Sequence, residues 1–259
     1  MKTASIVIIS DIHLRSENCQ AKLLLNTLRE YDYETLIING DLIEDDRVHP
    51  DNIKMNWQQF QLIEYMRARL RKKNTAKKII RIGGNHDFSG HDFINQILGI
   101  ETLLEYRWEM NGKKFCAIHG HQFDRFVFKN PLLSKFISNI TLFLQKIDSR
   151  KRYLTRMIDR FHTKWFRLTE IVAHDAIEFA RREGIDVIIC GHTHEGMQRV
   201  FTEDGRTIEY WNSGDWTGHR CSFITIDEKG VIELHFFMNP PSPINQNVNN
   251  SDNSLSSLC

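Results

Sequence analysis

The chain has 259 residues, of which 41% are hydrophobic and 26% are charged, and its formal net charge is +1. These values are ordinary for a soluble globular protein, and the length allows one domain with insertions or two small domains. A chain so close to neutral is not an obvious nucleic-acid binder as a whole, so no nucleic-acid partner is expected.

Short apolar runs alternate with helical patterns along most of the chain. β-branched residues predict the strands, and apolar residues at helical spacing predict the helices. This alternation is typical of an α/β sandwich whose helices cover the sheet. In chain order we expect strand 5–9, helix 19–30, strand 35–39, helix 55–73, strands 78–82 and 114–118, helices 129–147 and 151–182, and strand 186–190.

The C-terminal part of the chain has a different pattern. Residues 207–211, 221–226 and 231–237 predict closely spaced strands, which we expect to form a second, antiparallel-leaning sheet. Residues 239–259 are rich in Asn and Ser and bury too little apolar surface to order themselves. We therefore expect a folded domain at 1–238 and a flexible tail at 239–259.

Two features of the sequence indicate the cellular compartment of the protein. No run reaches the roughly 18 apolar residues of a transmembrane helix, and the first apolar run is interrupted by Asp11, as in a buried strand and unlike a signal peptide. The five cysteines are scattered without the paired spacing of a disulfide framework or a zinc knuckle. We therefore expect a cytoplasmic protein.

Polar side chains follow five of the predicted strands, usually beside a glycine. In an α/β sheet, ligands bind at the carboxyl ends of the strands, where such side chains would meet. One of these positions alone could reflect turn chemistry, because Asp and Asn favour turns, but five in a row are hard to explain that way. The residues, in order of the strands, are Asp11 and His13; Asp41; Asn85, His86 and Asp87; His119; and His192 and His194.

The chemistry of this set indicates a metal centre. Carboxylate, amide and imidazole groups without thiolates suit Mn, Fe, Zn or Co. The ligands are too many for one four-coordinate ion, which favours two ions sharing a carboxylate. Two ions about 3.5–4 Å apart are the usual arrangement for attack on phosphorus.

The order of these motifs resembles the calcineurin-like metallophosphoesterases. Their signature stands here as "SDIHL", "NGDLIED", "GGNHDF", "IHGHQFD" and "CGHTHEG", and the resemblance covers roughly residues 5–237. It implies a four-layer α-β-β-α sandwich, two divalent ions with Mn as the first expectation, and hydrolysis of a phosphodiester or diphosphate by a metal-bridging hydroxide. "HGHQFD", "CGHTH" and "WNSGDW" look most like the UDP-2,3-diacylglucosamine diphosphatase group of lipid A biosynthesis.

The resemblance also implies a role for each residue at the strand ends. The first metal would be held by Asp11, His13 and His194, and the second by Asn85, His119 and His192, with Asp41 bridging the two. His86 would donate to a phosphoryl oxygen or protonate the leaving group, and Asp87 would fix the tautomer of His86.

The chain departs from the lipid A members at two positions, because His86 stands where arginine is usual and His121 where aspartate is frequent. Two neighbouring stretches have simpler interpretations. The acidic run Glu44–Asp46 is expected to face solvent, since three acids in a row usually do. The polar loop 212–215 is a candidate to approach the metals.

A helical cap insertion is expected at about 126–182. Eight Lys or Arg against two Asp lie between Lys146 and Arg167. This basic ridge is either a solvated helix face or a surface that binds a diphosphate or an anionic membrane while its apolar side holds acyl chains. The residues assigned to substrate binding on this ridge are Arg152, Arg156, Arg160 and Lys164.

Three functions stay open at this point. The favoured one is a dinuclear hydrolase of a lipid-linked nucleoside diphosphate, acting in the cytoplasm or peripherally at the inner membrane face. The second is a phosphodiesterase or phosphatase of soluble nucleotides. The third is a scaffold that kept the fold without the chemistry, and the complete ligand set argues against it.

Overall fold

A computed structural model describes residues 1–44, 55–71, 77–87, 98–124, 154–217 and 220–238. Within helix α6, the side chains are described from Leu168 onward. The predicted helix 129–147 and the tail 239–259 lie outside the described residues. Within the described part, no helix is both long and apolar enough to cross a membrane.

The strands form two sheets with mixed directions. The first sheet has the order β11-β10-β1-β2-β3-β4, and the second has the order β5-β6-β7-β9-β8. The first sheet consists of β1 (Lys2–Ile9), β2 (Tyr31–Asn39), β3 (Lys78–Ile82), β4 (Thr102–Leu103), β10 (Arg220–Ile226) and β11 (Ile232–Met238). The second consists of β5 (Glu105–Met110), β6 (Lys113–Ile118), β7 (Val187–Cys190), β8 (Met197–Glu203) and β9 (Arg206–Asn212).

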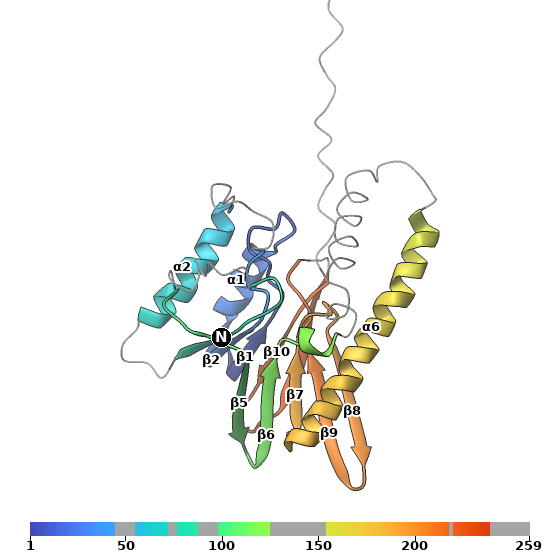
Figure 1. Ribbon diagram of the computed structural model, residues 1–259. Helices are drawn as coiled ribbons and strands as arrows, with labels where there is room; N and C mark the ends of the chain where they lie inside the picture. Colours follow the sequence, from blue (N-terminus) through green and yellow to red (C-terminus); the bar gives the residue numbers. More distant parts are fainter. Residues whose placement is uncertain (45–54, 72–76, 88–97, 125–153, 218–219, 239–259) are drawn as a thin grey trace, which may run out of the picture.

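Helices cover the outer face of each sheet, so the molecule has the predicted four layers α-β-β-α (Figure 1). The first sheet is covered by α1 (Ala21–Glu30) and α2 (Trp57–Arg71), and the second by α6 (Leu154–Glu183). In α1 the buried residues Ala21, Leu24, Leu25 and Leu28 recur at helical spacing, which places them on one face. This face packs against the first sheet.

A third apolar cluster lies between the two sheets. Ile8 and Ile37 of the first sheet meet Phe115 and Ile189 of the second there. All four are buried. Parallel strands that are covered on both faces have continuous apolar sequences. This explains the apolar runs in β1, β2 and β7, which lie between the helices and the other sheet.

The half of α6 from Leu168 onward belongs to the sandwich. Val172, Ala176 and Ala180 are buried against the second sheet. The small alanines allow the helix to approach the sheet closely. The cap predicted at 126–182 is therefore too long at its C-terminal end, and the remainder lies outside the residues whose side chains are described.

The expected separate C-terminal sheet is wrong. β9 pairs in parallel with β7 in the second sheet, whereas β10 pairs antiparallel with β1 in the first. After its first residue, β10 is buried on both faces, which suits a strand inside a sheet and not a peripheral one. The chain thus crosses between the sheets through the loop after Asn212, and this crossing brings the polar loop 212–215 to the carboxyl ends of β1 and β7.

Candidate metal centre

Six of the seven predicted ligands lie close together at one edge of the sandwich. The loops after β1, β2 and β3 and those after β6 and β7 all leave the same end of their sheets, because β1–β3 are parallel to one another and β6 is parallel to β7. Three groups of side chains with ligand atoms within 4.8 Å of one another result. Two of them consist of predicted ligands, Asp11 with His13 and His194, and Asp41 with His119 and His192, and the third is His13 with Glu44 and His86.

Asp41 lies between the two groups. Its Oδ2 atom is 3.3 Å from Nε2 of His119 and 3.9 Å from Nε2 of His13. His13 Nε2 is also 3.9 Å from Asp11 Oδ1, which in turn lies 3.2 Å from Nε2 of His194. The carboxylate of Asp41 is therefore in reach of both clusters.

Several buried polar atoms in this region have no hydrogen-bond partner in the described part of the chain. They are Asp11 Oδ1, His13 Nε2, Asn85 Oδ1 and His119 Nε2. Each such atom costs about 1–3 kcal/mol when it is left unsatisfied. Oxygen and imidazole donors of this kind suit divalent ions, so the residues present fit the two ions that the sequence predicts.

Hydrogen bonds on the far side of the rings fix which nitrogen faces the cluster. Nδ1 of His119 lies 2.8 Å from the backbone carbonyl oxygen of Asn39, which can only accept, so Nδ1 donates and Nε2 is the nitrogen that faces the cluster. Nδ1 of His13 lies 2.6 Å from Oε2 of Glu44. Such partners orient ligating imidazoles and raise their basicity.

The remaining two histidines have carboxylate partners from loops. Nε2 of His192 lies 3.1 Å from Oδ2 of Asp124, which leaves Nδ1 for the cluster. Nδ1 of His194 lies 3.3 Å from Oδ2 of Asp215. The loop 212–215 thus approaches the centre, as the sequence suggested, and it does so by supporting a ligand.

The backbone is strained at the ligands. In the described part of the chain, eight residues other than glycine have positive φ, and five of them are predicted ligands. A positive φ outside glycine costs on the order of 1–3 kcal/mol and concentrates at functional sites, with Asp, Asn and His tolerating it best. The five are Asp11 (51°), His13 (47°), Asp41 (50°), His192 (67°) and His194 (55°).

Two glycines of the motifs make room for ligand side chains. A Cβ atom on Gly84 would lie 2.0 Å from Oδ1 of Asp41, and one on Gly191 would lie 2.6 Å from Oδ2 of Asp11. A Cβ atom and a non-bonded oxygen atom cannot approach so closely. The glycines beside the ligands are thus required for close approach to the two buried carboxylates.

The charges in the cluster are strongly coupled to one another. Burial alone would raise the pKa of Asp11, but the charges of His194 and His119 outweigh it and lower that pKa to about 2. The pKa of Asp41 lies well below its usual range because nearby imidazoles, first His119, outweigh the effect of burial. In return, the carboxylates overcome burial and raise the pKa of His119 to about 9 and that of His194 to about 10. Both carboxylates are therefore ionised and ready to bind cations.

Glu44 is the carboxylate that contacts His86. Nδ1 of His86 lies 3.1 Å from Oε1 of Glu44, while Nε2 points toward the cluster, 4.0 Å from Oδ2 of Asp41. Burial would raise the pKa of Glu44, but hydrogen bonds from His13 and His86 outweigh it and hold that pKa well below its usual range. The expectation that Glu44 faces solvent is therefore wrong, and Asp45 and Asp46 lie outside the described residues.

Asp87 has a different position from the one expected. Its carboxylate accepts hydrogen bonds from the backbone N–H groups of Gly84 (2.9 Å) and Ile43 (3.3 Å) and lies 3.3 Å from the buried Arg81. Burial raises its pKa in spite of Arg81. These contacts join the loop after β3 to the loop after β2, so Asp87 shapes the loop that holds Asn85. The carboxylate that contacts the His86 ring is that of Glu44.

His121 lies beside the second cluster without belonging to it. Its ring centroid is 5.4 Å from that of His119 and 6.3 Å from that of His192. Burial, together with the charges of His119 and His192, lowers the pKa of His121 to about 3. It is therefore a neutral imidazole against the second ligand group.

The predicted substrate-binding residues are not placed by the structure. Arg152 lies outside the described residues. Arg156, Arg160 and Lys164 belong to α6, but their side chains fall in its undescribed part. Their role stays a prediction.

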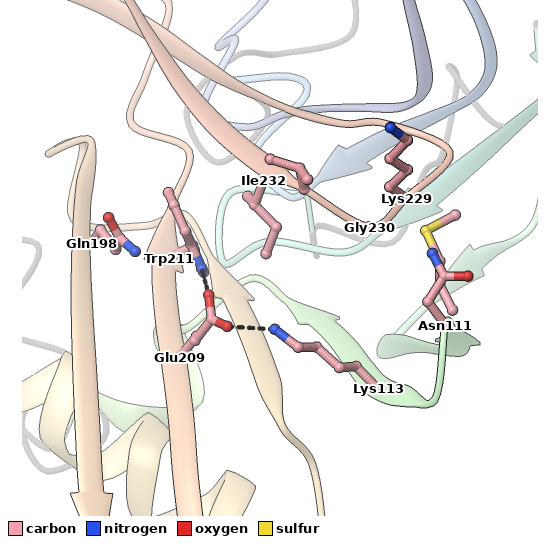
Figure 2. Close-up of a pocket in the computed structure, with 10 residues that line it drawn as sticks. Asn111, Lys113, Gln198, Glu209, Trp211, Lys229, Gly230 and Ile232 are labelled. Carbon is pink, nitrogen blue, oxygen red and sulfur yellow. Dashed lines mark hydrogen bonds and ion pairs between the residues drawn. The ribbon is translucent and has the colours of Figure 1, made fainter.

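A cleft of about 480 Å³ lies at the opposite end of the sandwich from the ligands (Figure 2). It is lined by the β5–β6 and β10–β11 turns and by β9. Its polar groups are paired among themselves, since Glu209 lies 2.8 Å from Lys113 Nζ and accepts a hydrogen bond from Trp211 Nε1 at 3.2 Å. This cleft is separate from the metal centre.

The close approach at Gly84 yields a first prediction. Gly84→Ala should displace Asp41 and lower the affinity for the metals about 10- to 100-fold. Gly112→Ala is the control, because a Cβ on Gly112 would meet nothing within 4 Å, although the positive φ of Gly112 (77°) makes alanine unfavourable there. It should lower Tm and keep the metals. Mass spectrometry measures the metal content of both variants, and a thermal melt measures their Tm. Full metal content in Gly84→Ala would contradict the role of Asp41 as a metal ligand.

The chain is similar to several known proteins. It is 26% identical to a UDP-2,3-diacylglucosamine hydrolase of Psychromonas ingrahamii, over 87% of this chain and 94% of that protein. It is 25% identical to the protein of the same name from Aliivibrio fischeri, over 89% and 98%. A solved structure of a novel archaeal phosphodiesterase aligns with 90% of this chain and 99% of its own at 17% identity and a TM-score of 0.45.

The family assignment rests on a match to a family model. Residues 4–196 match the model of the calcineurin-like phosphoesterases. This region contains all seven predicted metal ligands together with His86. The family implies divalent metal ions and a phosphorylated substrate. The groups of side chains at the strand ends could hold such metal ions. The chain thus belongs to the calcineurin-like phosphoesterase family and is a metal-dependent phosphoesterase.

Proposed function

We propose that this enzyme hydrolyses a diphosphate bond in a lipid-linked nucleoside diphosphate such as UDP-2,3-diacylglucosamine. The observation that carries the proposal is the position of Asp41 between two ligand groups, 3.3 Å from His119 and 3.9 Å from His13. It supports a pair of ions and not one. The relatives named UDP-2,3-diacylglucosamine hydrolase support the substrate class, because the match covers nearly the whole of each.

Each ligand side chain has a part in this proposal. The first ion would be held by Asp11, His13 and His194, the second by Asn85, His119 and His192, and Asp41 would serve both. Mn is the first choice for the ions, with Fe, Zn and Co as alternatives. When bound, two such ions polarise phosphoryl oxygens and make water nucleophilic at neutral pH.

The chain's own residues supply orientation and a proton donor. Glu44 holds Nδ1 of His86, so that Nε2 is directed toward the space above Asp41 where a phosphoryl oxygen would lie. There it can donate a hydrogen bond to developing charge or a proton to the leaving oxygen. Asp124 and Asp215 keep His192 and His194 in one orientation, which limits the cost of reorganisation during the reaction.

The lipid part of the substrate would be bound outside the metal centre. The basic ridge at Arg152, Arg156, Arg160 and Lys164 can pair with phosphates or with anionic lipid headgroups. In this proposal the enzyme is cytoplasmic and contacts the inner membrane peripherally.

A comparison of two substrates tests this function. Purified enzyme with Mn should hydrolyse UDP-2,3-diacylglucosamine far more efficiently than bis-p-nitrophenyl phosphate, by kcat/KM. In ¹⁸O water the label should enter one of the two monophosphate products, as attack on phosphorus requires. Preference for soluble nucleotides over the acylated substrate would instead favour the phosphodiesterase or phosphatase alternative.

The shared carboxylate gives a second prediction. Asp41→Ala should abolish activity and reduce bound metal to about zero to one ion per chain, because both groups lose a ligand. Asp32→Ala is a suitable control, since Asp32 lies at the opposite end of β2. Metal analysis together with turnover checks the result. Two ions and normal turnover in Asp41→Ala would rule out the shared site.

The position of His86 gives a third prediction. His86→Ala should lower kcat about 100- to 1000-fold, the usual cost of losing a donor to the transition state. Its metal content should match the parent, because His86 is not among the proposed ligands. His174→Ala, at a side chain that is 74% exposed on α6, is the matched control. An unchanged kcat would assign His86 a structural role only.

The basic ridge gives a fourth prediction. Replacing Arg152, Arg156 and Arg160 together with Gln should preserve the helix, since Gln is a good helix former. The variant should hydrolyse the small chromogenic ester normally and lose most activity on the acylated substrate or on anionic vesicles, because the lipid part is bound outside the metal centre.

The matched control for this triple change removes three cations from the other end of the molecule. Lys113, Lys114 and Arg182 are exposed where β6 begins and α6 ends. Replacing them with Gln should leave both activities intact. If the ridge variant and this control behave alike on both substrates, the ridge is a solvated helix face.

A further inference from the structure

The metal centre is exposed on the side of His194 and His86. The side chains of His194 and His86 are 32% and 23% exposed, whereas those of Asp11 and His119 are fully buried. A substrate can approach across these two histidines. Residues beside His194 at this opening are in a position to contact the parts of the substrate that do not react.

Arg220 lies at this edge of the sandwich. β10 runs antiparallel to β1 with Ile224 opposite Ile8, so Arg220, four residues earlier, lies beyond the end of β1, where Asp11 follows. Side chains alternate along a strand, and Ile224 faces the second sheet. Arg220 is therefore on the inner face of the first sheet, next to the seam between the sheets where the ligands meet.

The contacts of Arg220 confirm this position. Its Nη1 atom lies 3.5 Å from Oε1 of Glu195, the residue after the ligand His194. Its guanidinium lies over the ring of Phe236, 4.1 Å from the ring centroid. The ring itself packs against Gly196, where an added Cβ would lie 2.9 Å from it. The guanidinium thus lies against the ring of Phe236, next to the opening.

The contact with Glu195 is weak and can be exchanged. Both side chains are about half exposed, 53% for Arg220 and 49% for Glu195, and 3.5 Å is long for a charged hydrogen bond. A planar guanidinium with several donors suits a phosphate group in two-point contact, and stacking on an aromatic ring fixes its plane. Only a cation held this way remains available for a substrate anion.

We propose that Arg220 binds the phosphate of the substrate that is not attacked, and that Glu195 occupies Arg220 until this phosphate arrives. The proposal rests on the proposed function, because only a diphosphate has a second phosphate to offer. Arg220 would then select diphosphates over single phosphates, and it would act through binding and not through the chemical step.

Inhibition by soluble probes tests this without any lipid. UDP-N-acetylglucosamine and UMP are compared as competitive inhibitors of bis-p-nitrophenyl phosphate hydrolysis at constant free Mn. Arg220→Gln should raise Ki for UDP-N-acetylglucosamine about tenfold, as loss of a charged hydrogen bond implies, and Ki for UMP less than about twofold. Arg220→Lys keeps the charge but loses the two-point contact of the guanidinium. Its Ki for UDP-N-acetylglucosamine should lie between that of Arg220→Gln and that of the parent.

Two further variants separate binding from packing. Glu195→Gln should lower Ki for UDP-N-acetylglucosamine, because it removes the competing carboxylate. Arg199→Gln is the matched control, since Arg199 is also half exposed and paired with a glutamate, Glu170 at 2.7 Å, on the face covered by α6. It should change neither Ki.

The outcomes that would overturn the proposal are specific. A parent enzyme that UDP-N-acetylglucosamine does not inhibit, an equal change in both Ki values in Arg220→Gln, or a rise in Ki in Glu195→Gln would each do so. These results are independent of whether the acylated substrate is hydrolysed, so a failure here is distinguishable from a failure of the proposed function.

Discussion

Each of the two ligand groups takes side chains from both sheets, and this constraint governs the rest of the structure. Asp11 and His13 from the first sheet meet His194 from the second, and Asp41 meets His119 and His192 in the same way. The two sheets must therefore be held in fixed positions at their carboxyl ends. A shift of the sheets by about 1 Å would separate ligands that have to converge on one ion.

Buried hydrogen bonds between the sheets provide this restraint at the ligand edge. The amide of Asn39, at the end of β2, donates to the backbone oxygens of Ile118 (3.2 Å) and Ile189 (3.1 Å), at the ends of β6 and β7. The backbone carbonyl of Asn39 accepts a hydrogen bond from Nδ1 of His119. Ser10 bonds to Ser213 (2.8 Å) and to the backbone oxygen of Gly214 (2.7 Å) in the crossing loop. The apolar cluster between the sheets sets their spacing, and these polar contacts set their alignment.

The same arrangement explains why the centre demands cations. Asp11 and Asp41 are fully buried, and two buried carboxylates in one site are costly unless positive charge compensates them. The imidazoles around them are held by Asn39, Glu44, Asp124 and Asp215 and cannot turn away. Buried charge, fixed donors and strained backbone thus concentrate where bound metal ions would offset their cost.

Sequence alone predicted most of the fold and the convergence of polar side chains at the strand ends, because strand ends are visible as apolar runs followed by polar residues. The pairing of β9 with β7 and of β10 with β1 was not predictable from local pattern, since adjacent strands in the chain usually pair with one another. No local pattern in the sequence indicated that Asn39 connects the two sheets, because its hydrogen-bond partners are 79 and 150 residues away.

Glu44 was misread for a related reason. Its acidic neighbours suggested solvent, whereas its spacing of three residues from Asp41 would have placed it near the centre. Asp87 was assigned to His86 because it is adjacent in sequence, but its side chain is taken up by the N–H groups of Gly84 and Ile43. Adjacent residues in a sharp loop point in different directions, so sequence proximity is a poor guide to contact there.

The central claim is that one carboxylate, Asp41, holds two ions together. Electron paramagnetic resonance of the protein during titration with Mn²⁺ tests it most directly. The account predicts saturation at two Mn per chain with the spectrum of an exchange-coupled pair. Saturation at one Mn per chain, or two Mn with the spectra of isolated ions, would contradict it.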